Sequence, residues 1–222
     1  MEKKEFNKLF DHTILKPYTT EEDLKRVCAD AKAYGFCSVA VNTGMVAACA
    51  RFLKGSDVLV DAAVGFPLGI TTIDCKVREA EEAIGNGAGE IDYVVNIGKV
   101  KEGDYAYIKE EMERIVAVCR EHHITSKVIF ENCYLEKEEI LSLCRIANEV
   151  KPDYIKTSTG FGPSSATAED VALMRENTDF GIKVKAAGGV RDLESCLAMV
   201  KAGAERIGCS NSTVIADSYK NK

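Results

Sequence analysis

The sequence contains few of the patterns that mark metalloproteins or membrane proteins. Its three histidines, His12, His122 and His123, form no His-x-Glu or His-Glu-x-x-His pattern, so we expect no zinc site and no metal cofactor. No apolar run reaches the roughly 18 residues that span a membrane, so we expect no membrane partner. The charged residues 1–5 lead into no apolar core typical of a signal peptide, which favours a cytoplasmic protein.

Basic residues are not in excess, since 29 lysines and arginines face 35 acidic residues, for a net charge of -6. This balance argues against a nucleic-acid partner. Nine cysteines are present, but none form a Cys-x-x-Cys pair, and their spacing is unlike that of metal ligands. We therefore expect small buried cysteines in a reducing compartment, with one exposed reactive thiol as the alternative.

Short apolar stretches alternate with amphipathic ones along the chain. We expect strands at residues 37–42, 57–65, 90–96, 126–132, 153–158, 181–187 and 204–208, and an eighth at 9–15. Helical periodicity is found at residues 104–122, 136–150 and 167–177, and Thr167 begins a capping signal. Near-continuous apolar strands separated by helices indicate parallel strands with helices on the outside.

Eight such units predict an α/β fold, a single (β/α)8 TIM barrel domain over residues 1–222 with a short N-terminal helix. An open doubly wound sheet is the alternative. Against the open sheet, no Gly-x-Gly-x-x-Gly fingerprint follows the first strand, and residues 85–89 (GNGAG) precede a strand instead of following one. We expect those glycines to end a helix and form a tight turn.

Two lysines stand where predicted strands run out into small residues. Lys156 precedes a Thr-Ser-Thr-Gly segment, and Lys185 precedes Ala-Ala-Gly-Gly. Lys183 would share a face with Lys185, but Lys185 is nearer the strand end, where barrel active sites form. A buried lysine is rare unless it is paired. Asp92, in another predicted strand, is either a catalytic carboxylate or a salt-bridge partner.

A pair of close lysines suggests a specific chemistry. A lysine has a reference pKa of about 10.4, so little neutral amine exists at neutral pH. A second cation nearby and partial burial both lower that pKa. The neutral amine can attack an aldehyde and form an iminium, which makes the adjacent carbon acidic. A carboxylate such as Asp92 can move the protons that this requires, and no metal is needed.

Two glycine-containing loops after late strands suggest a phosphate site. Residues 188–191 (GGVR) follow one predicted strand, and residues 208–212 (GCSNS) follow the last strand and open a final helix. Backbone N–H groups freed by glycine, beside a helix N-terminus, suit a dianion. Barrels often bind phosphate in such loops, although a Gly-Gly pair alone is usually only a turn.

These motifs, in their order along the chain, resemble the deoxyribose-phosphate aldolase family. The matching segments are residues 11–13 (DHT), 91–98 (IDYVVNIG), 156–161 (KTSTGF), 185–191 (KAAGGVR) and 208–212 (GCSNS). The resemblance implies a class I, metal-independent aldolase on a (β/α)8 barrel, which reversibly cleaves 2-deoxy-D-ribose 5-phosphate to D-glyceraldehyde 3-phosphate and acetaldehyde through a lysine Schiff base. It also implies no cofactor, a small phosphorylated sugar and aldehydes as partners, and a homodimer or higher homo-oligomer.

The resemblance gives each matching residue a role. Lys156 would be the Schiff-base nucleophile, Lys185 the cation that lowers its pKa, and Asp92 the proton-relay carboxylate. Asp11 would lie near the substrate hydroxyls or near the second lysine. The phosphate would be held by Gly160, Gly188, Gly189, Gly208, Ser210 and Asn211. Relatives often carry paired serines in the last loop, and the asparagine found here leaves the phosphate contacts open.

Two other classes of function remain as alternatives. Another barrel enzyme that acts on a sugar phosphate, such as an isomerase or a transaldolase-like enzyme, would share the phosphate loops. Reductive trapping with acetaldehyde would separate an isomerase, because an isomerase needs no imine. A non-catalytic binding barrel is disfavoured, because it has no use for two close lysines.

Overall fold

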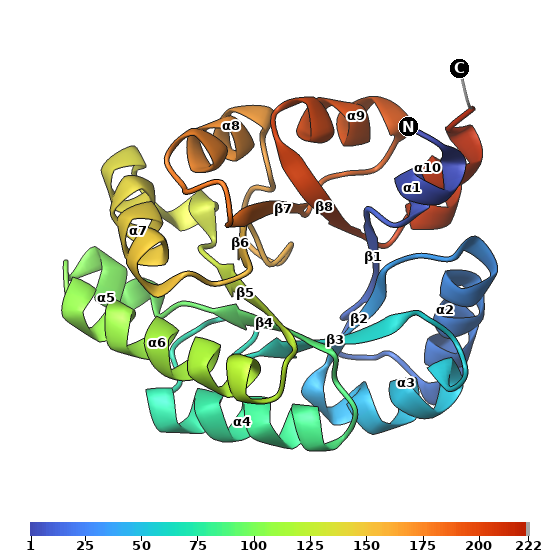
Figure 1. Cartoon of the computed structure of the whole chain (residues 1–222), viewed down its shortest axis with the longest axis horizontal. Coiled ribbons are helices and arrows are strands. Elements are labelled where there is room, and N and C mark those ends of the chain that lie inside the picture. The colour runs from blue at the N-terminus through green and yellow to red at the C-terminus, as the bar shows by residue number, and fades with distance from the viewer. Residues whose placement is uncertain (221–222) are drawn as a thin grey trace.

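The computed structural model describes residues 1–220 and shows eight parallel strands that close into a barrel in chain order, with helices around the outside (Figure 1). The strands are β1 (Phe10–Ile14), β2 (Ser38–Asn42), β3 (Leu59–Val64), β4 (Glu90–Val94), β5 (Thr125–Ile129), β6 (Tyr154–Lys156), β7 (Lys183–Ala187) and β8 (Ala204–Cys209). Pairing of β1 with β8 closes the ring. The predicted (β/α)8 barrel is therefore confirmed, and the open-sheet alternative is wrong.

Ten α-helices and two short 3-10 helices lie within residues 1–220. They are α1 (Lys3–Asn7), α2 (Glu21–Tyr34), η1 (Thr43–Met45), α3 (Val46–Leu53), α4 (Ile73–Gly85), α5 (Ile97–Lys101), α6 (Tyr105–Glu121), η2 (Asn132–Tyr134), α7 (Lys137–Val150), α8 (Ala168–Glu176), α9 (Leu193–Lys201) and α10 (Ser212–Ser218). The predicted N-terminal helix is α1. It lies beside α10, so the first and last helices meet on one side of the barrel (Figure 1).

Local signals in the sequence account for most element ends. The Thr167 side chain accepts the N–H of Asp170 and caps α8, as predicted. The turn at residues 85–89 is also confirmed, because α4 ends there and Gly87 has a φ of +104°. The strand predicted at 153–158 is shorter than expected, because the chain turns out of the sheet after Lys156 and reaches a left-handed conformation at Gly160.

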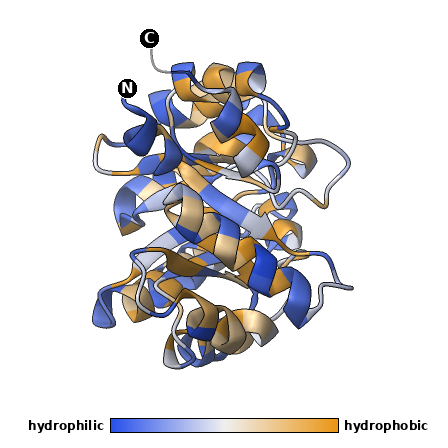
Figure 2. Ribbon diagram, turned by 90° about the vertical axis from the view of Figure 1, so that its right-hand side faces the viewer, coloured by the Kyte–Doolittle hydropathy of each residue, from blue (hydrophilic) through white to orange (hydrophobic). Residues whose placement is uncertain are grey.

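Alternate strand positions face two different environments. Ile91 and Tyr93 of β4 join the apolar core between the strands and the helices. Glu90 and Asp92 of the same strand point into the barrel and contact Lys127 of β5. Hydrophobic and hydrophilic residues alternate along the surrounding helices, as amphipathic packing requires (Figure 2). The molecule thus has an apolar shell around a charged barrel interior.

A buried ion pair between two outer helices fixes the end of β4. Lys76 of α4 and Glu111 of α6 lie 2.6 Å apart, and neither side chain is exposed. Lys76 Nζ donates to the carbonyl of Val94 at 2.7 Å, and Glu111 accepts the N–H of Asn96 at 3.0 Å. Both charges are therefore satisfied, and the chain just beyond Asp92 is held in place.

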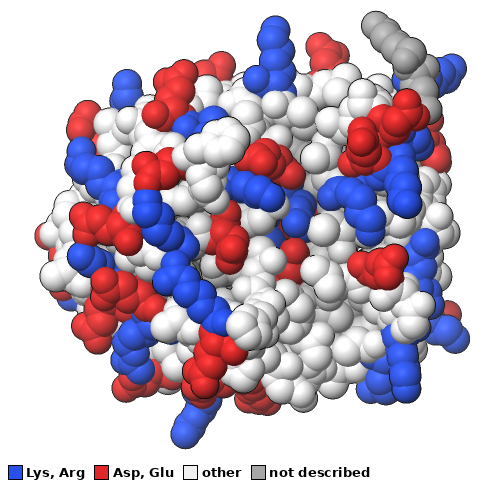
Figure 3. Space-filling model, in the orientation of Figure 1, with Lys and Arg blue, Asp and Glu red and all other residues white. Residues whose placement is uncertain are grey.

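Most cysteines are buried and the surface charges are mixed in sign. All nine cysteines are unpaired and six are buried, whereas Cys75 is exposed. Acidic and basic side chains are interspersed over the face seen in Figure 3. Within residues 1–220, no helix has the length and hydropathy to cross a lipid bilayer.

Candidate active site

Lys156 and Lys185 lie side by side inside the barrel. Lys156 ends β6, Lys185 lies in β7, and the register of the two strands pairs these residues directly. Their side chains are buried, with only 4% and 1% of their surface exposed. Lys183, at the start of β7, is exposed instead, with its Nζ 5.6 Å from the ring centroid of Tyr154. Of the two lysines of β7, only Lys185 is therefore buried beside Lys156.

One carboxylate oxygen joins the two buried lysines. Asp92 Oδ2 lies 2.5 Å from Lys156 Nζ and 2.6 Å from Lys185 Nζ. Asp92 belongs to β4 and is itself buried, so it reaches both amines across the barrel interior. Because both ammonium groups can donate to the same oxygen, Asp92 can exchange a proton with either lysine.

Asp11 of β1 lies beside the second lysine. Its Oδ2 is 2.5 Å from Lys185 Nζ, and its Oδ1 accepts hydrogen bonds from Ser38 at 2.6 Å and Arg206 at 2.7 Å. Asp11 is fully buried and does not line the cavity described below. Of the two positions that the resemblance implied, the structure shows the one near the lysine.

Sequence reasoning missed four charged residues that complete this network. They are Asp61 of β3, Glu90 of β4, Lys127 of β5 and Arg206 of β8. Lys127 Nζ lies 3.0 Å from Asp61, 2.9 Å from Glu90 and 2.8 Å from Asp92. Arg206 pairs with Glu90 at 3.1 Å as well as with Asp11. Every one of these charges therefore has a partner of opposite sign.

The network balances its charges. Four carboxylates (Asp11, Asp61, Glu90 and Asp92) face four cationic side chains (Lys127, Lys156, Lys185 and Arg206), so the formal charge is zero when all are ionised. Oxygens of Asp11, Asp61 and Glu90 lie within 4.8 Å of one another, a spacing that could hold a metal ion. Three cations, Lys127, Lys185 and Arg206, already lie among these oxygens and balance their charge.

The environment distinguishes the two neighbouring lysines. Burial lowers the pKa of Lys156 because it disfavours the charged ammonium; Asp92 opposes this effect and the Lys185 cation adds to it. Burial acts on Lys185 in the same way, but Asp11, Asp61 and Asp92 outweigh it and raise the pKa of Lys185. Lys156 is therefore the lysine that more readily becomes a neutral amine, and Lys185 remains a cation.

The pKa values of Asp92 and Asp61 shift in opposite directions. Burial alone would raise the pKa of Asp92, but Lys127, Lys156 and Lys185 hold it well below its usual range. Asp61 behaves differently. Burial and then the charge of Asp92 raise the pKa of Asp61 to about 6, although Lys127 and Lys185 oppose the shift.

A further buried carboxylate fixes the loop after β6. Glu131 accepts hydrogen bonds from both the N–H, at 3.1 Å, and the hydroxyl of Thr159. Its own backbone has a φ of +59°, which is uncommon for a residue other than glycine. On the other side, Thr157 Oγ1 accepts the N–H of Ala187 at 3.2 Å. The loop that leads to Gly160 is thus held by the segment after β5 and by the end of β7.

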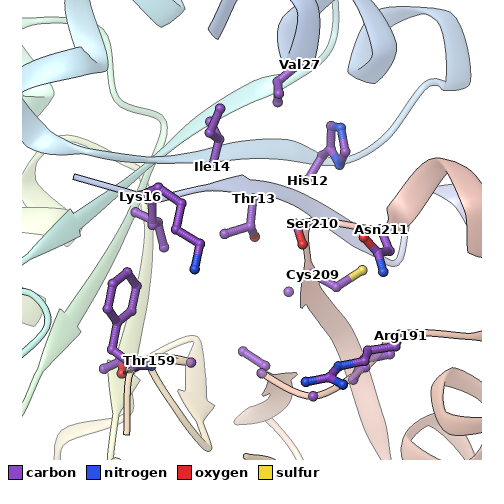
Figure 4. Close-up of a pocket in the computed structure, with 18 of the residues that line it drawn as sticks. His12, Thr13, Ile14, Lys16, Val27, Thr159, Arg191, Cys209, Ser210 and Asn211 are labelled. Atoms are coloured by element: carbon purple, nitrogen blue, oxygen red, sulfur yellow. Dashed lines mark hydrogen bonds between the residues drawn. The ribbon is translucent and has the colours of Figure 1, made fainter. Parts of the chain in front are cut away.

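A cavity of about 510 Å³ opens beside Lys156 at the ends of the strands (Figure 4). Its wall includes every residue that the resemblance assigned to phosphate: Gly160, Gly188, Gly189, Gly208, Ser210 and Asn211. Gly188 and Gly189 have φ values of +78° and +73°, which glycine adopts readily. Figure 4 shows Arg191 and Asn211 on one side of the cavity and Lys16 on the other.

Comparison with known proteins agrees with this geometry. Residues 7–211 match the model of the DeoC/LacD family aldolases. The chain belongs to this aldolase family. Membership makes it a carbon–carbon lyase.

Several members of the aldolase family are close relatives. The deoxyribose-phosphate aldolase of Lactobacillus acidophilus is 53% identical over 97% of this chain and 91% of its own length. That of Bacteroides thetaiotaomicron is 47% identical over 96% of this chain and 89% of its own length. A putative deoxyribose-phosphate aldolase from Coccidioides immitis superimposes with a TM-score of 0.93 at 35% identity, covering 98% of this chain and 86% of that one.

Proposed function

We propose that this aldolase reversibly cleaves 2-deoxy-D-ribose 5-phosphate to D-glyceraldehyde 3-phosphate and acetaldehyde through a Schiff base on Lys156. The observation that carries the proposal is that the buried amine of Lys156 both lines the cavity and contacts Asp92. The names of the relatives that are 53% and 47% identical support the choice of substrate.

The residues around Lys156 suit the steps of a retro-aldol reaction. The neutral amine of Lys156 attacks the C1 aldehyde carbon, and loss of water from the carbinolamine gives an iminium. The iminium accepts the electron pair as the C2–C3 bond breaks, so glyceraldehyde 3-phosphate leaves and an enamine remains. Asp92, 2.5 Å from Lys156 Nζ, takes up and returns protons directly or through a water. Protonation and hydrolysis then release acetaldehyde.

Reductive trapping tests this proposal directly. With acetaldehyde and borohydride, the chain should gain one two-carbon unit, and peptide mapping should find it on Lys156. A label on Lys185, or no label, would contradict the assignment. An isomerase or a binding barrel would give no label, because neither forms an imine with acetaldehyde.

We also propose that the substrate phosphate binds at the glycine-rich side of the cavity. The residues concerned are Gly160, Gly188, Gly189, Gly208, Ser210 and Asn211, all in the cavity wall. Backbone N–H groups near left-handed glycines form concave anion sites, and Arg191 lines the same cavity. Binding energy from the phosphate can then hold the sugar for reaction at its other end.

Gly189→Val should raise KM for the phosphorylated substrate by about tenfold or more, because interactions with a charged group are worth roughly 1.5–3 kcal/mol. Gly189 has a φ of +73°, and a Cβ there would lie 2.7 Å from Ser165 Cβ, so the loop must move. KM for unphosphorylated deoxyribose should change far less. Gly181→Val is the matched control, because a Cβ at Gly181 would meet no atom of residues 1–220 within 4 Å. An equal loss for both sugars would mean that this segment is only a turn.

Turnover should survive prolonged treatment with EDTA, because we propose that no metal or other cofactor takes part. The charge of the three carboxylates with suitable spacing is already balanced by Lys127, Lys185 and Arg206. Activity should be measured before and after chelation and again after zinc is added. A loss that zinc restores would point to a metal-dependent aldolase instead.

We further propose a single-domain cytoplasmic enzyme that forms a homo-oligomer. Nine unpaired cysteines support a reducing compartment. Self-association is supported by the deoxyribose phosphate aldolase from Aeropyrum pernix, which is described as tetrameric and superimposes with a TM-score of 0.88 at 27% identity over 98% of this chain and 92% of that one. Sedimentation of the intact chain would measure its oligomeric state.

A further inference from the structure

Asp61 is a buried carboxylate to which the proposed mechanism gives no role. It lies on β3 with none of its surface exposed, and its Oδ2 is 3.0 Å from Lys127 Nζ and 2.9 Å from Lys185 Nζ. Its other oxygen, Oδ1, is buried and has no hydrogen-bond partner in the described residues. An unpaired buried oxygen is costly when the carboxylate is charged, which favours the protonated form of Asp61.

The charge balance of the network indicates that a proton for Asp61 would come from Lys156. The interior network has four cations and four carboxylates, and it is neutral when Lys156 is charged. Before Lys156 can attack an aldehyde it must lose a proton, which would leave one uncompensated negative charge in the buried network. Such a charge is unfavourable at low dielectric, so a second group should take up the proton.

A continuous chain of contacts leads from Lys156 to Asp61. Lys156 Nζ is 2.5 Å from Asp92 Oδ2, and that oxygen is 2.6 Å from Lys185 Nζ. Lys185 Nζ is in turn 2.9 Å from Asp61 Oδ2. Every step lies within hydrogen-bonding distance, and the donors and acceptors alternate along the chain.

We propose that Asp61 accepts the proton that Lys156 releases, so that the free amine forms by proton transfer within the barrel. A bond from Lys156 Nζ to hydrogen breaks as Asp92 Oδ2 takes the proton. Lys185 gives one of its own protons to Asp61 Oδ2 and takes the proton from Asp92 in its place. The result is a neutral Lys156, an ionised Asp92, a charged Lys185 and a neutral Asp61, with no proton lost to solvent. This inference rests on the proposed role of Lys156.

The charged groups around Asp61 fit this role. Those facing it are Asp11 from β1, Glu90 and Asp92 from β4, Lys127 from β5 and Lys185 from β7. Burial and Asp92 raise the pKa of Asp61 to about 6, and burial lowers the pKa of Lys156. The two shifts bring the two groups closer in proton affinity, as a shared proton requires.

The proposal predicts an unusual pH dependence for imine formation. Above the pKa of Asp61, moving a proton from Lys156 to Asp61 leaves the number of protons bound to the protein unchanged. The fraction of Lys156 present as free amine is therefore independent of pH until the protein releases that proton to solvent. In Asp61→Asn the proton must go to solvent. The fraction of free amine should then rise about tenfold per pH unit until Lys156 itself titrates.

The experiment measures the rate at which acetaldehyde and cyanoborohydride label Lys156, from about pH 6.5 to about pH 8.5. The ratio of the Asp61→Asn rate to the wild-type rate cancels the pH dependence of the reagents, and it should rise about tenfold per unit. Glu111→Gln is the matched control: Glu111 is also a buried carboxylate, but it pairs with Lys76 outside the barrel and is not part of the interior network. Its ratio to wild type should stay constant with pH.

A constant ratio for Asp61→Asn would overturn the proposal, because a purely structural role lowers the rate equally at every pH. Wild-type protein provides an independent test if the variant fails to fold. A wild-type rate that rises about tenfold per unit, relative to a model amine that stays protonated, would also overturn it. Absence of any label on Lys156 would instead contradict the proposed function itself.

Discussion

Lys156→Met should lower kcat/KM by about four orders of magnitude or more, the largest effect expected of any single substitution in this chain. Methionine has a similar volume but no amine, so no imine can form. Asp92 still keeps Lys127 at 2.8 Å and Lys185 at 2.6 Å as partners, so the variant should fold. Steady-state rates with 2-deoxy-D-ribose 5-phosphate, together with urea unfolding, would separate lost chemistry from lost structure.

Lys183→Met is the matched control for this substitution. Lys183 is also a strand lysine near the barrel, but it is exposed at the start of β7 and lies over the ring of Tyr154. Its loss should leave kcat/KM within about threefold of wild type, since exposed substitutions usually change free energies by about 0.5 kcal/mol or less. More than about 1% of wild-type activity in Lys156→Met would show that another residue carries the nucleophile.

The barrel could be predicted because its signals are local. Each strand appears as an apolar run, and helix ends carry caps such as Thr167, so counting the alternations gives eight units. Closure of the ring follows from that number. The end of β6 was less predictable, because it depends on the long-range bonds of Thr157 and Thr159 with β7 and Glu131.

The candidate site could be predicted only in part. Lys156 and Lys185 stand out because small residues and glycines follow them at the strand ends. Lys127 is followed by large apolar residues, and Asp61 lies in the middle of its strand and not at the strand end. Their signal is a charge in a buried run, but the sequence alone does not show that both point inward and meet. Lys76 illustrates the ambiguity, since it is buried on a helix with Glu111 outside the barrel.

The structure also shows contacts between residues on strands that are not adjacent in the ring. Asp92 is two strands away from Lys156 around the ring, and Asp11 is two away from Lys185. Both contacts are 2.5 Å long because the side chains reach across the barrel interior, and that of Asp11 with Lys185 also requires the pairing of β1 with β8. The register of neighbouring strands therefore explains why the two lysines lie side by side, but it does not explain why Asp92 and Asp11 contact them.

Lys185→Met should shift the acid limb of the pH–rate profile upward by about one to two units, with about a tenfold loss of neutral amine per unit at neutral pH. Lys185 is one of the causes that lower the pKa of Lys156, so its removal raises that pKa. The sign follows because a higher pKa keeps Lys156 protonated, and inactive, to a higher pH. The measurement is kcat/KM as a function of pH.

Two further readouts separate this electrostatic role from loss of structure. Removing Lys185 takes a cation away from Asp11, Asp61 and Asp92, so unfolding should become easier by about 3–5 kcal/mol in urea titrations. Instability alone would reduce activity equally at every pH and leave the acid limb in place. Lys185→Arg keeps the charge, so its limb should stay near that of wild type even if the longer side chain slows turnover. A profile that is lowered but not shifted in Lys185→Met would mean that Lys185 orders the carboxylates without tuning the nucleophile.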